Sequence, residues 1–591
     1  MSSRALTLGR ILLFHLFFTA NAQSPREVAW SSRSYGPDGP WQAVTVSVGT
    51  PSQNFDLLPG GSWMSNVLSP SVCRDTVESL SCSPQASGFY NVSASSTSYI
   101  TPVTSFVHND SFAGVMGALP LFGNATWAFD EITFSSGYPS AGSVTVPDFD
   151  MFVISEGYST LPDGSEYSLE VGNLALGAPD VNQSWARSGD SRWNGTLLTS
   201  YLYETGQTPS NSYGLHIGSA AIGIPGSLYV GGYDQSRVLG AVSTQEYGSD
   251  NLPIDLLDIG IGVAEGGSPF NYNAKSGLLA QGNSSIGGSM TILVDATAPY
   301  LYLPQSTCDA ITRDLPVVYD ATRGLYIWST EDARYEQIVS SPSYLGFTFR
   351  LNSSVIQNMT INVPFSLLNL NLTAPLVTSP TPYFPCRPYS SGKEHGRFSL
   401  GRAFLQAAFV GVNWQTDHKG RWFLAQAPGP NTPSIFTPTA IGPTDNFLYA
   451  STNQWADTWK GHWTALESTT TTASGSAPND GAGNNTASGN ISYASHSTLD
   501  LSTGAKAGIA IGAVIVGMAI VVTLVICFER WRTDRNARLR IRQSGNLPLS
   551  NHRYGSSSID LKTWGNERYK GAGFGPGELD AEHSDRIPEL G

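Results

Sequence analysis

Short runs of β-branched and aromatic residues, separated by glycine, proline, asparagine and serine, recur along residues 43–426. Almost no segment in this range repeats its apolar residues with the helical period. The clearest runs are AVTVSVG at 43–49, GSLYVGGY at 226–233, TILVDATAPYLYLP at 291–304 and GFTFRLN at 346–352. Residues 306–315 favour a short helix. The pattern predicts an all-β body.

Length and charge limit what this body can be. A chain of 591 residues exceeds what one hydrophobic core supports, so we expect two lobes, at about residues 43–243 and 244–426. Only 13 % of the residues are charged and the net charge is -14. An acidic chain without a basic run in its body offers no phosphate-binding surface, so no nucleic-acid partner is expected.

The N-terminus has the composition of a secretory signal. Arg4 and Arg10 precede an apolar run at 11–19, and an Ala-Asn-Ala sequence ends at Ala22. The apolar run is too short to cross a bilayer. We therefore predict a signal peptide over residues 1–22, cleavage before Gln23, and a short N-terminal extension over 23–42.

A second apolar segment, residues 507–528, contains no charge and is long enough to span a membrane. Six arginines follow it within fifteen residues, which predicts a cytoplasmic tail over 529–591, disordered because of its polar composition. Gly508 and Gly512 have the small-residue spacing of helix pairs, so a helix-mediated dimer is an open alternative. The ectodomain would then lie outside the cell or in the lumen, at the plasma membrane or a secretory-pathway membrane.

Residues 427–506 change in composition. They are first rich in proline and then, from Ser468, in serine, threonine, glycine and asparagine, which bury too little apolar surface to fold. We predict a stalk. Trp455, Trp459 and Trp463 recur every four residues between body and stalk, and docking on the body is the favoured interpretation over an exposed adhesive patch.

Cysteines and glycosylation sequons fit an oxidising compartment. Cys527 lies in the apolar segment; the close spacing of Cys73 and Cys82, and one pair in each half, favour disulfides Cys73–Cys82 and Cys308–Cys386 among three connectivities. Asn-x-Ser/Thr sequons occur only before the apolar segment. They are at Asn91, Asn109, Asn124, Asn182, Asn194, Asn283, Asn352, Asn358, Asn371, Asn484 and Asn490.

Several segments, in order along residues 43–426, resemble those of the pepsin-like aspartic protease family. They are VSVGTPSQNFDLL at 46–58, GFYNVSASSTSY at 88–99, GNATWAFDEITF at 123–134, VGNLALGAP at 171–179, ILVDATAPYLYLP at 292–304 and FSLGRAFLQAAFVGVNW at 398–414. The resemblance implies a bilobal fold with one catalytic loop in each lobe and a cleft between them. It also places Cys73 and Cys82 in the small disulfide loop after the first catalytic site.

The two loops depart from the family's Asp-Thr/Ser-Gly sequence. Residues 60–62, Gly-Gly-Ser, stand where Asp, Thr and Gly are expected, so Gly60 replaces the first catalytic aspartate. In the second loop Asp295 is kept, but Ala296 lacks the hydroxyl that fixes the loop and Thr297 replaces glycine. A reaction in which two carboxylates share a proton needs both of them.

We therefore expect a cell-surface glycoprotein that is catalytically inactive and binds a peptide or another cell-surface ligand in its cleft. One alternative is a membrane-anchored acid endopeptidase in which Asp56 or Asp130 partners Asp295. Another is an adhesion or structural glycoprotein, in which Asp295 only hydrogen-bonds its own loop. No zinc motif, nucleophile elbow or phosphate-binding loop occurs, so neither a metal nor a cofactor is expected.

Overall fold

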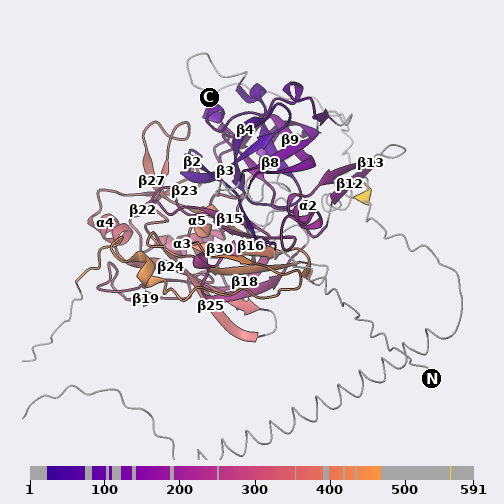
Figure 1. Ribbon diagram of the computed structural model, residues 1–591. Coiled ribbons are helices and arrows are strands. Elements are labelled where there is room, and N and C mark those ends of the chain that lie inside the picture. Colours follow the sequence, from indigo (N-terminus) through magenta and orange to yellow (C-terminus); the bar gives the residue numbers. More distant parts are fainter. Residues whose placement is uncertain are drawn as a thin grey trace, which may run out of the picture. The chain divides into compact units, whose positions relative to one another are not determined.

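The computed structural model describes residues 23–73, 83–100, 106–108, 121–135, 142–180, 182–186, 192–248, 252–352, 355–389, 398–416, 420–432, 436–467 and 559–560. They form many strands and a few short helices, which confirms the all-β class (Figure 1). Within these ranges, no helix has the length and apolarity needed to cross a membrane. The predicted signal peptide at 1–22, the predicted span at 507–528 and nearly all of the predicted tail lie outside them.

Strands from the first half of the chain, drawn indigo to magenta in Figure 1, form a large mixed sheet that β33, from near the C-terminus, joins at one edge. Its strands alternate buried and more exposed positions where one face packs on the core, as β3 does. The strands are β2 (Trp30–Tyr35), β3 (Trp41–Val48), β4 (Gln53–Pro59), β5 (Ser65–Leu68), β6 (Tyr99–Ile100), β7 (Phe106–His108), β8 (Leu121–Phe134), β9 (Val144–Thr160), β10 (Glu166–Ser168), β11 (Gly172–Leu174), β12 (Asn182–Ala186), β13 (Arg192–Thr196) and β33 (Ile559–Asp560).

The second half forms two sheets of its own. The larger contains β18 (Leu252–Val263), β19 (Ala274–Lys275), β20 (Met290–Val294), β21 (Leu301–Leu303), β24 (Ser343–Asn352), β25 (Val355–Pro364), β28 (Cys386–Pro388) and β29 (Ser399–Leu400). The smaller contains β22 (Val317–Asp320), β23 (Leu325–Trp328), β26 (Leu370–Leu372) and β27 (Thr381–Phe384).

A further sheet takes strands from both halves, in the order β1-β15-β14-β30-β31-β17. Its strands are β1 (Arg26–Glu27), β14 (Ser212–His216), β15 (Ser227–Val230), β17 (Leu239–Glu246), β30 (Ala408–Asn413) and β31 (Arg421–Gln426), and a separate pair joins β16 (Gly232–Asp234) to β32 (Pro438–Ala440). The α-helices are α2 (Leu198–Glu204), α3 (Gln305–Thr312), α4 (Ala333–Ser340) and α5 (Arg402–Leu405).

The same three-strand arrangement occurs once in each half. In the first, β11 runs parallel to β4 and antiparallel to β5. In the second, β29 runs parallel to β20 and antiparallel to β21. In both cases a loop leaves the outer strand, β4 or β20, and returns to the strand on the other side of the central one. These two loops are the ones that the sequence marks as candidate catalytic loops.

The folded body extends beyond the boundaries predicted at residues 43 and 426. Strand β1, from the predicted N-terminal extension, pairs with β15, and Trp41 is buried. On the C-terminal side, Leu448 and Trp459 are buried against the body, and Thr464 N donates to Ser340 O at 2.8 Å. The tryptophans of the predicted stalk therefore dock on the body, and the ordered C-terminal segment continues to residue 467.

Candidate functional site

Gly60 and Asp295 occupy equivalent positions in the repeated arrangement. Each directly follows a strand residue that pairs with a leucine of the central strand: Pro59 with Leu174, and Val294 with Leu400. The backbone N–H of Gly60 donates to Leu174 O at 3.0 Å, and that of Asp295 donates to Leu400 O at 3.1 Å. The strand pairing and backbone hydrogen bonds of Gly60 and Asp295 thus agree with the equivalence that the sequence predicts.

The two loops meet at these positions. A β-carbon built on Gly60 would lie 2.6 Å from Cβ of Ala296, which is closer than non-bonded carbons approach one another. The equivalent atom on Gly61 would lie 3.2 Å from Cγ2 of Thr297. Gly60 also has φ +153, a backbone conformation that favours glycine. The contact between the loops leaves no room for a side chain where the first carboxylate would stand.

The carboxylate of Asp295 is bound by its own loop. Oδ1 accepts hydrogen bonds from the backbone N–H of Thr297 at 2.9 Å and from its hydroxyl at 2.6 Å. Withdrawal from water raises the pKa of the Asp295 carboxyl above its ordinary value, and these hydrogen bonds offset part of the rise. Thr297, which the sequence marked as a departure from the family pattern, therefore supplies the hydroxyl that Ala296 lacks.

We expect Asp295→Asn to stabilise the protein near pH 7. Because the pKa of Asp295 is raised in the folded state, the contribution of Asp295 to wild-type stability is greatest below the unfolded-state pKa of about 3.9 and falls as pH rises through the folded-state pKa. Asparagine keeps the acceptor for Thr297 and has no charge to desolvate. In urea unfolding from about pH 3 to 7, the free energy of unfolding of Asp295→Asn relative to wild type should rise with pH. Glu331→Gln, at an exposed position, should show no such rise.

Arg402 holds the second loop through hydrogen bonds to its backbone. This buried residue opens helix α5, and its Nη1 donates to the carbonyl oxygens of Ala296 at 3.2 Å and Thr297 at 2.8 Å. Its guanidinium also lies over the ring of Trp41, 5.0 Å from the centroid. The positive charge of Arg402 favours the ionised form of Asp295 and so lowers the pKa of that carboxyl, against the effect of burial. A cation rather than a second carboxylate therefore accompanies Asp295.

Asp56 and Asp130, the alternative partners for Asp295, have other roles. Asp56 lies on β4 and accepts hydrogen bonds from the hydroxyls of Thr45 at 2.6 Å, of Ser31 at 2.5 Å and of Tyr35. Asp130 lies on β8 and accepts from the hydroxyls of Tyr90 and Thr97, each at 2.6 Å. Both carboxylates are nine-tenths or more buried in these networks. Among the described residues, neither carboxylate has a hydrogen bond to Asp295 or its loop.

A buried cluster of tyrosines and charged residues lies beside the second loop. The hydroxyl of Tyr383 donates to Asp38 O at 2.6 Å, and Arg387 lies over the ring of Tyr300, 5.7 Å from the centroid. Burial raises the pKa of both tyrosines well above the ordinary value. No sequence signal joined the YLYLP segment at 300–304 to Asp38, more than 250 residues away.

The predicted disulfide Cys308–Cys386 is confirmed, with its Cα atoms 5.9 Å apart. The pairing of Cys73 with Cys82 stays a prediction because Cys82 lies outside the described residues. Asn109, Asn484 and Asn490 also lie outside them, and the other eight sequon asparagines are all at least partly exposed. No group of three metal-ligating side chains was found in the ranges that the structure describes.

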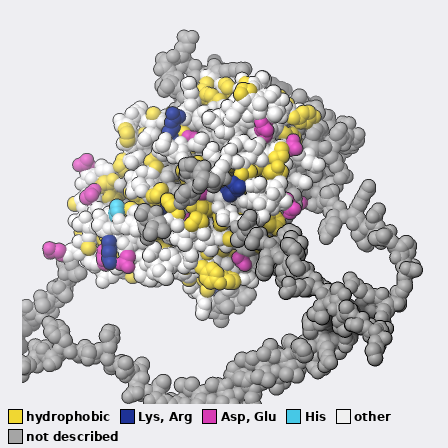
Figure 2. All heavy atoms as spheres, in the orientation of Figure 1, with side chains coloured by type: hydrophobic (Ala, Val, Ile, Leu, Met, Phe, Trp, Pro, Cys, Tyr) yellow, Lys and Arg dark blue, Asp and Glu magenta, His cyan; other side chains and the backbone are white. Residues whose placement is uncertain are grey.

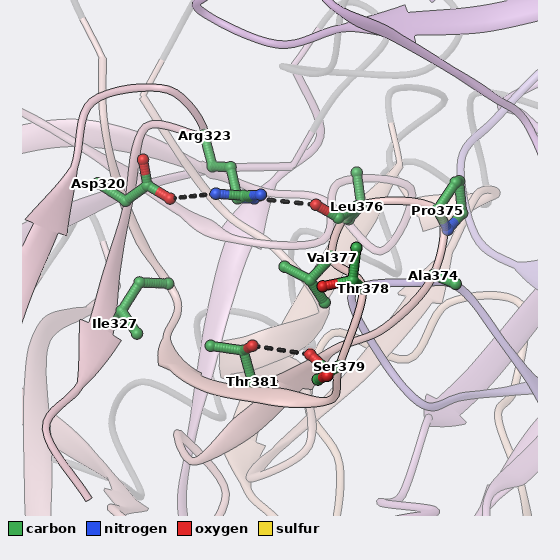
Figure 3. A pocket seen from close by; sticks show the side chains of 10 residues that line it. All are labelled: Asp320, Arg323, Ile327, Ala374, Pro375, Leu376, Val377, Thr378, Ser379 and Thr381. Atoms are coloured by element: carbon green, nitrogen blue, oxygen red, sulfur yellow. Dashed lines mark hydrogen bonds and ion pairs between the residues drawn. The ribbon is translucent and has the colours of Figure 1, made fainter.

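The structure also contains a cavity of about 650 Å³ away from the two loops (Figure 3). It lies between the β22–β23 turn and residues 374–381. Arg323 lines it, with Nη1 2.6 Å from Asp320 Oδ2 and Nε donating to Leu376 O at 3.0 Å, so its charge is already paired. On the face drawn in Figure 2, acidic and basic side chains are scattered and do not gather into a patch. Neither figure shows a charged site that would be an alternative candidate to the two loops.

One comparison with known proteins bears on this site. A protein of Aspergillus oryzae (strain ATCC 42149 / RIB 40), described as "Probable aspartic-type endopeptidase opsB", is 26% identical over 294 residues, which are 47% of this chain and 50% of that protein. The chain thus spans about half the length of this relative. No protein-family model matches the chain. The chain is distantly similar to an aspartic-type endopeptidase, which agrees with the resemblance carried by its motifs.

Proposed function

We propose that the chain is a bilobal, aspartic-peptidase-like protein that does not catalyse peptide hydrolysis. The observation that carries the proposal is the equivalence of Gly60 and Asp295, in strand pairing and in backbone hydrogen bonding. Hydrolysis by this class needs one carboxylate as base toward water and one as acid toward the carbonyl. With Gly60 in the first position, the site has one carboxylate for two tasks.

The neighbourhood of Asp295 supports the same conclusion. Arg402 brings a positive charge to the loop, and Asp56 and Asp130 are held by tyrosine, serine and threonine hydroxyls elsewhere. An acid-base pair would require a second titratable group whose pKa is set against that of Asp295. The alternative proposal of an acid endopeptidase keeps one argument, the similarity to the Aspergillus oryzae protein described as a probable aspartic-type endopeptidase.

The proposed role is binding of a peptide or of an extended segment of a cell-surface protein along the two loops. The proposal also includes a secretory signal at 1–22, a membrane span at 507–528 and an ectodomain on the extracellular or lumenal side, at the plasma membrane or a secretory-pathway membrane. The hydrophobicity of 507–528 and the arginines after it support this topology. Such an arrangement would tether a binding surface to the membrane through the predicted stalk.

Paired ligands can test binding and chemistry together. An enzyme binds a transition-state analogue about 10²- to 10⁸-fold more tightly than the matching substrate, because it is complementary to the transition state. We expect a peptide and its hydroxyl-containing, non-cleavable analogue to bind the secreted ectodomain with equal affinity in calorimetric titrations. Strong preference for the analogue, lost in Asp295→Asn, would support the endopeptidase alternative; binding of neither ligand would contradict the peptide-binding role.

A further inference from the structure

A second cavity, of about 370 Å³, lies between two segments far apart in sequence. One wall is the turn between β2 and β3, at residues 36–40, and the other is β26 with the loop that follows it. The lining residues are Gly36, Gly39, Pro40, Asn371, Thr373 and Pro380. A β-carbon on Gly36 would lie 2.7 Å from Trp41 Cδ1, and one on Gly39 would lie 2.6 Å from Trp41 N, so neither glycine position of the turn has room for a side chain.

Asn371 lies on this cavity and begins an Asn-Leu-Thr sequon that ends at Thr373. It is the exposed residue of β26, between the buried Leu370 and Leu372. Among the described residues its side-chain amide has no hydrogen-bond partner, whereas the amide of Asn124 donates to Glu156. The sequon therefore presents a free amide at the edge of a cavity that has no side chain filling it.

We propose that an N-linked glycan on Asn371 occupies this cavity and packs across the interface between the turn at residues 36–40 and strand β26. A pyranose ring has apolar C–H faces and hydroxyl edges. The rings of Pro40 and Pro380 supply apolar surface for the faces, and Thr373, which also lines the cavity, supplies a hydroxyl for the polar edges. The sugar is attached to one wall and contacts the other.

The glycan would reinforce an interface that already depends on backbone hydrogen bonds. Three successive carbonyls of the turn accept from the second half of the chain: Pro37 O from Thr373 N at 2.7 Å, Asp38 O from the Tyr383 hydroxyl at 2.6 Å, and Gly39 O from Asn371 N at 3.4 Å. Covering these bonds with sugar slows their opening to solvent. Through Asp38 and Trp41, the turn also supports Arg402, which holds the Asp295 loop.

Hydrogen exchange on the full-length glycoprotein, produced in a secreting eukaryotic host, tests the proposal. Mass spectrometry should find glycan on Asn371. Enzymatic removal of glycans from the folded protein should then accelerate amide exchange severalfold in peptides covering residues 36–41 and 370–374, with little change elsewhere. Thr373→Ser keeps the sequon and a hydroxyl donor to Pro37 O, so it should retain both glycan and protection.

Asn371→Gln and Asn358→Gln form the matched pair of variants, since both positions are exposed sequons and only Asn371 lines the cavity. Faster amide exchange at residues 36–41 in Asn371→Gln, but not in Asn358→Gln, supports the proposal. If Asn371→Gln fails to fold, the enzymatic removal of glycans from the wild-type protein decides the question. An empty Asn371 beside an occupied Asn358, or unchanged exchange after deglycosylation, overturns it. Two empty sequons would overturn both this inference and the secretory topology on which it rests, without bearing on the chemistry of Asp295.

Discussion

Gly60→Asp is expected to destabilise the protein by about 2 to 5 kcal/mol and to leave it without peptidase activity. The new β-carbon would lie 2.6 Å from Cβ of Ala296, and φ at this position is +153, so overpacking and backbone strain add together. Urea unfolding would show the loss as a lower midpoint with an unchanged slope. An aspartate at position 60 would therefore not create a working pair of carboxylates, because Ala296 of the second loop occupies the space that the new side chain needs.

Two further variants separate the causes. Gly240 has φ +64 and no atom within 4 Å of its β-carbon, so Gly240→Asp measures the cost of a left-handed backbone conformation without overpacking and should lose about 1 to 2 kcal/mol. Gly60→Asp combined with Ala296→Gly removes the opposing methyl group and should recover the overpacking share. If Gly60→Asp were as stable as Gly240→Asp, that result would contradict the close contact between the two loops.

His216 should make the protein lose stability on acidification. The imidazole is 1% exposed, its Nε2 lies 2.9 Å from Gln406 O, and burial followed by the charge of Arg237 lowers its pKa from 6.5 to about 3. The folded-state pKa is depressed, so the unfolded state takes up a proton first as pH falls below 6.5. At 1.36 kcal/mol per pH unit, the loss is about 2 kcal/mol at pH 5 and about 5 kcal/mol at pH 3.

His216→Gln is the test of this effect. Glutamine keeps an N–H donor for Gln406 O but cannot be protonated. The free energy of unfolding of wild type minus that of the variant should fall by about 2 kcal/mol between about pH 7 and 5. His462 is exposed, so His462→Gln should show no comparable change. A pH-independent difference for His216→Gln would contradict the depressed pKa.

The sequence predicted the strands better than the loops that join them. The runs at 43–49 and 346–352 correspond to β3 and β24, and the short helix predicted at 306–315 is α3, shifted by a residue at its start. The run at 291–304 forms β20 and β21 with the Asp295 loop between them, and the motif rather than the apolar pattern indicated that loop. Apolar periodicity does not register a loop whose own residues are buried.

The candidate site was predictable only in part, for a physical reason. The missing carboxylate at Gly60 and the presence of Asp295 follow from motif alignment within each half. The approach of Gly60 to Ala296 and the hydrogen bonds from Arg402 join residues more than a hundred positions apart. No local pattern encodes such contacts. For the same reason, composition does not reveal which surface Trp459 packs against, although docking on the body was the favoured interpretation of its spacing.

The most direct test of the central claim is turnover of an unfolded protein substrate by the secreted ectodomain between about pH 3 and 6, beside Asp295→Asn. Intrinsic fluorescence at each pH should confirm that the ectodomain remains folded, because His216 weakens it in acid. We predict no cleavage above background by the folded protein and no difference between wild type and Asp295→Asn. Cleavage by wild type that disappears in Asp295→Asn would contradict the account and show that Asp295 works with another carboxylate.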